Sequence, residues 1–172
     1  IEINASDQKI SIFNVYAEYK PHWAEGAFVK GGLATIDFGY ELPYSSSKRA
    51  AFERSLYMAD LFPGDTDMGL MVGYNGTLCQ SKRWQLESTL SILAGDGGKG
   101  MMKNSPDLAL RLALTEQGSN HNISFGLSGY GGYLPATDGY YAFDKGAATF
   151  KNDHMLRAYG GAFLTSTIKH QG

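Results

Sequence analysis

The sequence lacks several features that mark common classes of protein. Among its 172 residues there is one cysteine, Cys79, so an internal disulfide is excluded. The 15 basic and 17 acidic residues leave a net charge of −2, which favours no nucleic-acid partner. No segment approaches the roughly 18 consecutive apolar residues of a membrane-spanning helix. Disulfide-rich, nucleic-acid-binding and helical membrane proteins are therefore all disfavoured.

Metal and cofactor motifs are also missing. Histidine occurs at four scattered positions, with no pair four residues apart and no cysteine cluster, so we expect no metal site. The glycine-rich run GDGGKG at residues 95–100 lacks the spacing of a phosphate-binding loop, and no helix is expected after it. We therefore expect no cofactor.

An enzyme is not expected either. The most plausible nucleophiles, Ser119 and Ser124, lie near His121 in the sequence, but no acid is apparent that would orient the imidazole. An outer-membrane lipid hydrolase remains the enzymatic alternative.

Strict alternation of apolar and polar residues is abundant. The stretch PDLALRLALT at residues 106–115 places leucine at 108, 110, 112 and 114, whereas Asp107 and Arg111 fall on the opposite face of a strand. The same period predicts strands at residues 9–20, 32–40, 67–75, 84–94, 107–115, 122–133 and 156–169, with the tail of an earlier strand at 1–5. One helix is expected, at residues 46–61, capped by a serine at 45, 46 or 47.

The connections between these strands alternate in length. Those at residues 21–26, 76–83 and 116–121 are short, whereas those at 41–66, 95–106 and 134–155 are longer. Outer-membrane barrels have short turns on the periplasmic side and longer loops on the extracellular side. We therefore predict an antiparallel transmembrane β-barrel, with the leucines facing lipid and Asp107 and Arg111 facing water inside.

Aromatic residues fit this prediction because six of them lie at or just beyond strand ends, where an interfacial girdle belongs. They are Tyr19, Trp23, Tyr40, Tyr74, Trp84 and Tyr133. The chain starts and stops next to strands, so we expect residues 1–172 to be one segment of seven to eight strands from a larger barrel. A soluble β-sandwich or small-barrel binding module, with the leucines inside, is the structural alternative.

Two stretches resemble the phosphate-selective porin O and P family and its porin relatives. They are FERS at residues 52–55 and LFPGDTDMGL at 61–70, preceded by the proline-bearing loop ELPY at 41–44. PDLALR at residues 106–111, after the glycine-rich loop, looks like a later strand of that family. The similarity extends over roughly residues 13–133.

This resemblance implies a passive diffusion channel in the outer membrane of a Gram-negative bacterium. It implies a homotrimer of barrels with about sixteen strands each, surrounded by lipid and lipopolysaccharide. A long loop, here residues 41–66, would fold inward and narrow the channel, and small hydrophilic or anionic solutes would pass. The pore and constriction candidates are Asp37, Lys48, Arg49, Glu53, Arg54, Glu87, Arg111 and Arg157.

The charge pattern argues against one feature of that family, the preference for phosphate. The inward charges expected on the strands are of both signs: Glu18, Asp37, Asp67, Glu87 and Asp107 against Lys20, Arg111, Arg157 and Lys169. A pore that selects anions needs a ring or ladder of basic side chains. Because no such ladder is present, we do not infer phosphate as the permeant.

Overall fold

The chain folds into antiparallel strands joined by connections of alternating length. The computed structural model describes residues 2–6, 9–43, 55–62, 65–78, 83–95, 106–134, 140–144, 147–151 and 155–168. The elements in these residues are β1 (Glu2–Ser6), β2 (Lys9–Tyr19), β3 (Ala27–Thr35), α1 (Leu56–Leu61), β4 (Thr66–Thr77), β5 (Trp84–Leu93), β6 (Asp107–Gln117), β7 (His121–Leu134), β8 (Tyr140–Asp144), β9 (Ala147–Lys151) and β10 (Met155–Ile168).

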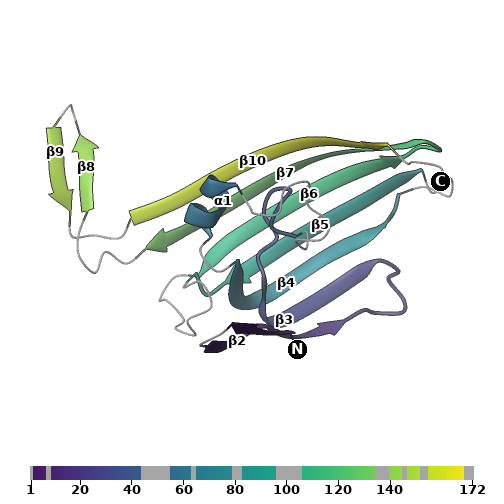
Figure 1. Ribbon diagram of the computed structural model, residues 1–172, viewed down its shortest axis with the longest axis horizontal. Helices are drawn as coiled ribbons and strands as arrows, with labels where there is room; N and C mark the ends of the chain where they lie inside the picture. Colours follow the sequence, from purple (N-terminus) through teal and green to yellow (C-terminus); the bar gives the residue numbers. More distant parts are fainter. Residues whose placement is uncertain are drawn as a thin grey trace.

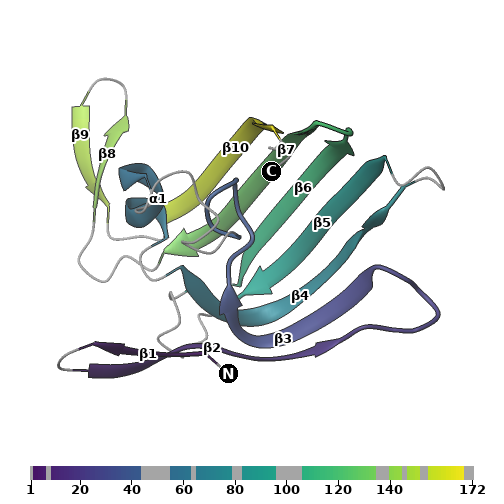
Figure 2. The same ribbon diagram turned by 45° about the vertical axis from the view of Figure 1, so that its right-hand side comes forward.

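Most strands belong to one sheet with the order β1-β2-β3-β4-β5-β6-β7-β10, and β8 and β9 form a separate hairpin (Figures 1 and 2). Every neighbouring pair is antiparallel. β1 pairs with the first part of β2, and the second part of β2 pairs with β3. The seven strands from β2 to β10 thus form the main wall, which confirms the prediction of an all-β antiparallel fold.

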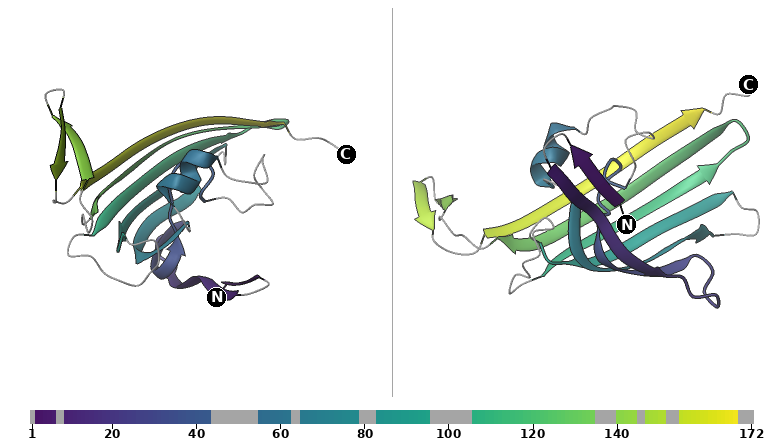
Figure 3. Two further views of the ribbon diagram at one scale, coloured as in Figure 1. Left: turned by 60° about the vertical axis from the view of Figure 1, so that its left-hand side comes forward. Right: turned by 60° about the horizontal axis from the view of Figure 1, so that its bottom comes forward.

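The main sheet is bent, so it has a convex and a concave face, and α1 lies on the concave side (Figure 3). Residues paired directly across two antiparallel strands point to the same face of a sheet. Leu108, Leu110 and Leu112 occupy the convex face with exposed fractions of 53%, 44% and 41%. The leucine row predicted from the alternation is therefore present, and it does not line a closed dry interior.

The buried hydrophobic core lies on the concave face, between the sheet and the segment that connects β3 to β4. It includes Ile36, Phe38 and Leu42 from this connection and Met58 and Phe62 from the region of α1. On the sheet it includes Ala34, Met71, Leu93, Ala109 and Tyr130. The connection thus folds back across the concave face and covers part of it.

The strand predicted at residues 32–40 is wrong in position. β3 spans Ala27–Thr35, and the alternating Ile36 and Phe38 continue inward instead of along the sheet. The amide of Ile36 donates to the carbonyl of Asp65 at 2.9 Å, and Gly39 has a φ of 62°, which favours glycine and turns the chain. The apolar period of this segment therefore reflects burial under the connection, not a strand.

The helix and the last long connection also differ from expectation. Within the described residues, α1 covers Leu56–Leu61, and no side-chain hydrogen bond caps its first turn at Ser55. The rest of the helix predicted at 46–61, with its serine caps, lies outside the described residues. The connection predicted at residues 134–155 contains the β8–β9 hairpin, whose sequences YYAFD and AATFK are rich in strand-forming residues. No helix in the described parts of the chain is long and apolar enough to cross a membrane.

Candidate functional site

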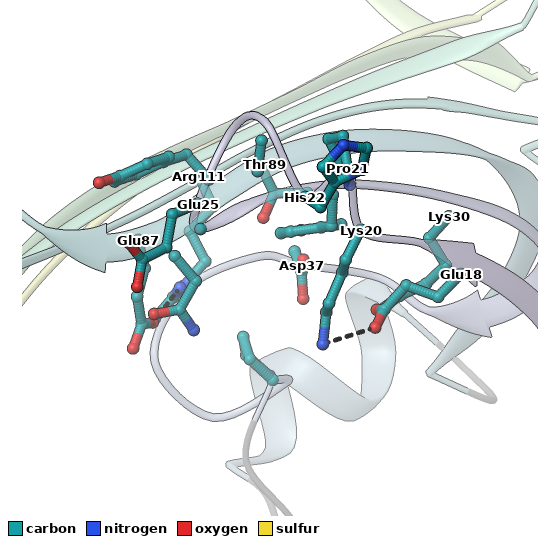
Figure 4. Close-up of a pocket in the computed structure, with 16 residues that line it drawn as sticks. Glu18, Lys20, Pro21, His22, Glu25, Lys30, Asp37, Glu87, Thr89 and Arg111 are labelled. Atoms are coloured by element: carbon teal, nitrogen blue, oxygen red, sulfur yellow. Dashed lines mark hydrogen bonds and ion pairs between the residues drawn. The ribbon is translucent and has the colours of Figure 1, made fainter.

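A groove of about 880 Å³ lies on the concave face near the short turn between β2 and β3 (Figure 4). Most of the lining residues are polar or ionisable, and they come from β2, β3, β4, β5, β6, the β2–β3 turn and the inward connection. Those that carry or can carry a charge are Glu18, Lys20, His22, Glu25, Lys30, Asp37, Glu87 and Arg111. A groove of this size is in the range that holds small molecules.

One end of the groove carries two lysines that share a carboxylate. Glu18 on β2 lies directly opposite Lys30 on β3, with Lys30 Nζ 3.8 Å from Glu18 Oε2. Lys20 Nζ lies 2.9 Å from the other carboxylate oxygen, Glu18 Oε1. The Lys30 ammonium also lies 4.8 Å from the ring centroid of Tyr16, where a ring face attracts a cation. This end therefore has one formal positive charge in excess.

A hydrogen bond to Glu18, and the negative charge of that carboxylate, raise the pKa of Lys20. The Lys20 ammonium therefore stays protonated at neutral pH. Since this side chain is 71% exposed, its pairing with Glu18 contributes little stability and can be exchanged for another anion.

The other end of the groove carries Arg111 and Glu87. Arg111 Nη1 lies 2.9 Å from Glu87 Oε2, and Arg111 Nε donates to the carbonyl of Gly39 at 3.0 Å. The guanidinium also lies 5.6 Å from the ring centroid of Phe163. Only 4% of the Arg111 side chain is exposed. The arginine therefore holds the inward connection to the sheet and does not present a free charge to solvent.

The tether at Gly39 has a second part, because the Gly39 amide donates to Ser128 Oγ on β7 at 3.0 Å. A side chain at this position would meet Met58 Cε at 2.6 Å, in addition to the unfavourable φ. Glu41 then accepts hydrogen bonds from the amide and the hydroxyl of Ser55 at 2.9 and 2.8 Å. The inward connection is thus fixed to the sheet and to the start of α1 by specific polar contacts.

A second polar cluster joins the long-loop ends of the strands. Arg157 on β10 forms a salt bridge with Asp107 on β6, and the Tyr130 hydroxyl on β7 donates to Asp107 Oδ2 at 2.6 Å. Arg157 also donates to the carbonyl of Gly95 at 3.3 Å, and the Gly95 amide donates to Asp67 Oδ2 at 2.7 Å. These bonds connect β4, β6, β7 and β10 through the start of the connection after β5.

Asp107 itself is fully buried and fits between two glycines. A Cβ at Gly95 or at Gly132 would overlap the Asp107 carboxylate, so only glycine leaves room for this side chain. The prediction that Asp107 and Arg111 lie on the face opposite the leucines is confirmed, whereas the prediction that they face water is wrong, because both are buried. Both point to the concave face, but the inward connection and the neighbouring polar groups cover them.

The predicted pore residues divide into three sets. Asp37, Glu87 and Arg111 come together in the groove, whereas Arg157 belongs to the separate cluster around Asp107. The four loop candidates, Lys48, Arg49, Glu53 and Arg54, lie outside the described residues. Asp37 was expected on a strand but lies in the inward connection.

Five ionisable groove residues were not among the predicted pore candidates: Glu18 and Lys20 were expected only as inward charges, and His22, Glu25 and Lys30 had no predicted role at the site. Lys30 lies directly before a glycine pair and fell outside both the predicted turn at 21–26 and the predicted strand, which was expected to start at residue 32. Glu25 sits in a turn, and only the folded structure brings that turn to the groove.

Among the predicted girdle residues, Tyr19, Trp23 and Tyr133 are exposed at strand ends. Tyr40 is not part of a girdle, because it lies in the inward connection, with its ring centroid 5.5 Å from that of Phe163.

No group of three or more His, Cys, Asp or Glu side chains that could hold a metal ion occurs in the described part of the chain. No protein-family model, curated protein or solved structure matches this sequence or fold.

Proposed function

We propose that this chain forms part of the wall of an outer-membrane β-barrel, a porin through which small hydrophilic solutes diffuse. The barrel would lie in the outer membrane of a Gram-negative bacterium, in contact with lipid and lipopolysaccharide. A homotrimer, as the resemblance to the phosphate-selective porins implies, is part of this proposal. In it, the convex face meets acyl chains, the concave face lines the channel, and the connection between β3 and β4 narrows it.

The observation that carries this proposal is the separation of ionisable side chains between the two faces. From Val15 of β2 to Ile168 of β10, the described strands place seven charged side chains on the concave face. They are Glu18, Lys30, Asp67, Glu87, Asp107, Arg111 and Arg157.

On the convex face of the same residues, the register leaves Glu116 and His121 as the ionisable side chains, both at the short-turn end. Glu116 accepts a hydrogen bond from Arg83 Nε at 2.8 Å. The middle of this face carries apolar or small residues, with exposed Leu70, Val72, Leu90, Leu110 and Leu127. A charge in contact with hydrocarbon is costly, so this distribution fits a lipid-facing wall.

The proposal also requires further strands at the edges of the sheet. β2 and β10 are the outer strands of the seven-stranded main wall and run in the same direction, and β1 pairs only with the part of β2 before Val15, which does not pair with β3. Joining them directly would need a parallel pair, whereas outer-membrane barrels of bacteria close with an even number of antiparallel strands. Unpaired edge groups cannot remain in hydrocarbon, so other strands must complete the wall.

Mixed charges in the groove favour no anion. With charges of both signs present, the channel would admit small polar solutes without a preference for phosphate. We propose that hydrophilic solutes diffuse through the channel, without the anion preference of the phosphate-selective porins that the sequence resembles.

The direct test is insertion of the intact, detergent-purified protein into planar lipid bilayers. We expect stepwise increases in conductance and a reversal potential near zero in a gradient of potassium chloride. A protein that stays monodisperse in buffer without detergent and gives no conductance would instead be a soluble binding module, and the proposal would be wrong.

A further inference from the structure

The groove on the concave face has its charges arranged as a dipole. Lys20 and Lys30 share Glu18 at one end, which leaves one positive charge in excess. At the other end, Glu87 pairs with the guanidinium of Arg111 and Glu25 adds a second carboxylate, which leaves one negative charge in excess. Figure 4 shows Asp37 between the Glu87 side and the Glu18 side of the groove.

We infer that this groove binds small zwitterions that carry an ammonium and a carboxylate, such as amino acids and short peptides. The carboxylate of the solute would lie at Lys20 and Lys30, and its ammonium at Glu25 and Glu87, with Asp37 between the two ends (Figure 4). Charged hydrogen bonds at both ends would fix the orientation of the solute along the groove. This inference rests on the proposed function for its biological meaning, since it names the class of solute that the channel favours.

Two other ligand classes fit the same groove less well. A divalent cation needs several oxygen ligands gathered on one point, and the described acidic side chains do not form such a group. An inorganic anion can use the two lysines at one end, but it has no positive charge for the carboxylates of Glu25 and Glu87 at the other end. A zwitterion is the ligand whose two charges match both ends.

Accessibility supports the assignment of the two ends. Lys20 and Glu25 are exposed at the mouth of the groove, so each can turn toward a solute without leaving a buried partner uncompensated. Lys30 and Asp37 are partly buried, so their charged groups stay in place within the groove. Phe28 adds an apolar surface between the ends for the carbon atoms of the solute.

The test measures binding of dialanine to the intact protein in detergent by titration calorimetry. Two capped analogues serve as probes: N-acetyl-dialanine, which lacks the ammonium, and dialanine amide, which lacks the carboxylate. We expect saturable binding of dialanine and a loss of at least about tenfold for each analogue, because each cap removes one charged hydrogen-bonding group.

Variants assign the two ends of the solute. Lys20→Gln should weaken dialanine and reduce its advantage over dialanine amide, whereas Glu25→Gln should reduce its advantage over N-acetyl-dialanine. Glu116→Gln, on the convex face outside the groove, is the matched control and should change neither ratio.

The inference is wrong if dialanine and its capped analogues bind equally, if none binds saturably, or if inorganic phosphate binds as tightly as dialanine. These results are obtained in detergent and do not depend on conductance. A protein that conducts but does not discriminate between the peptides would retain the proposed function and lose the inference. A protein that discriminates between the peptides but never inserts into bilayers would support the binding site and contradict the proposed channel.

Discussion

Arg111 and Gly39 join the sheet to the connection that crosses it, with Arg111 Nε 3.0 Å from the Gly39 carbonyl oxygen. The same guanidinium holds Glu87 at 2.9 Å, so one side chain from β6 fixes both the groove and the inward segment. In the proposed channel, this bond determines how far the connection reaches into the lumen. Loss of this contact should therefore both lower the free energy of unfolding and change the width of the passage.

Replacing Arg111 with methionine tests this tether. The change leaves the carboxylate of Glu87 and the carbonyl of Gly39 without their donor, and breaking a buried ion pair costs about 3–5 kcal/mol. We expect the free energy of unfolding in detergent, measured by urea titration, to fall by about 3 kcal/mol.

Arg83→Met is the matched control, because Arg83 pairs with Glu116 while its side chain is 63% exposed. An exposed pair is worth at most about 1 kcal/mol. Equal losses in the two variants would show that Arg111 is not a tether.

Gly132→Ala tests whether the buried Asp107 carboxylate needs the space that Gly132 leaves. The new methyl group would overlap the Asp107 carboxylate and push it away from Arg157 and Tyr130. Overpacking of this kind costs about 1–3 kcal/mol, measured as a lower midpoint of urea unfolding.

The control for this change is Gly129→Ala, three residues earlier on the same strand. No heavy atom lies within 4 Å of the position that its Cβ would take. We expect a change within about 0.5 kcal/mol. A neutral result at Gly132 as well would mean that Asp107 is not confined by this glycine.

Phe62→Ala tests how the connection is held on the concave face. Phe62 is buried, with its ring centroid 5.0 Å from that of Tyr130 and 5.0 Å from that of Phe38. Truncation of a buried phenylalanine costs about 3–5 kcal/mol. We expect a less stable protein and a larger single-channel conductance, because the connection would leave the concave face more easily.

Leu56→Ala, at the exposed first residue of α1, should change neither quantity. An unchanged conductance in Phe62→Ala, together with a clear loss of stability, would mean that this connection does not obstruct the passage.

Leu110→Arg tests the environment of the convex face. If Leu110 lies near the middle of the bilayer, arginine there costs about 2–4 kcal/mol, whereas near an interface the cost is about 0–1 kcal/mol. Ile123→Arg, near the short-turn end of β7, is the control for the interfacial position. Folding into phospholipid vesicles, followed by urea titration, measures both. Equal and small effects would mean that Leu110 does not lie in the hydrocarbon core.

Much of the sheet could be predicted from the alternation alone. Six strands, β2, β4, β5, β6, β7 and β10, occur where the apolar period placed them, because the alternation gives each one an apolar and a polar face. The period failed at residues 36–40, where Ile36 and Phe38 alternate for burial under a folded connection. Alternation reports which side chains are buried together, and a strand is only one way to achieve this.

The polar contacts could not be predicted in the same way. Arg157 and Asp107 are separated by 50 residues, and their pairing depends on the register of β6, β7 and β10. The groove is also lined by the turn before β3 and by the connection after β3, and only the fold brings these two segments together. Asp37, Glu87 and Arg111 were predicted as a set by their charge and face, whereas Glu25 becomes a groove residue only through the fold.

The most direct test of the channel proposal is to measure what touches the strand at residues 108–113. A nitroxide is attached to single cysteines at these positions, in a background where Cys79 is replaced with serine, and the protein is reconstituted in lipid vesicles. Collision rates are then measured with oxygen, which concentrates in hydrocarbon, and with a water-soluble nickel complex. We expect high oxygen and low nickel rates at 108, 110 and 112, with low oxygen rates at 109, 111 and 113. High nickel rates at the leucine positions, or low rates with both reagents, would place the leucines in water or inside protein and would contradict the proposal.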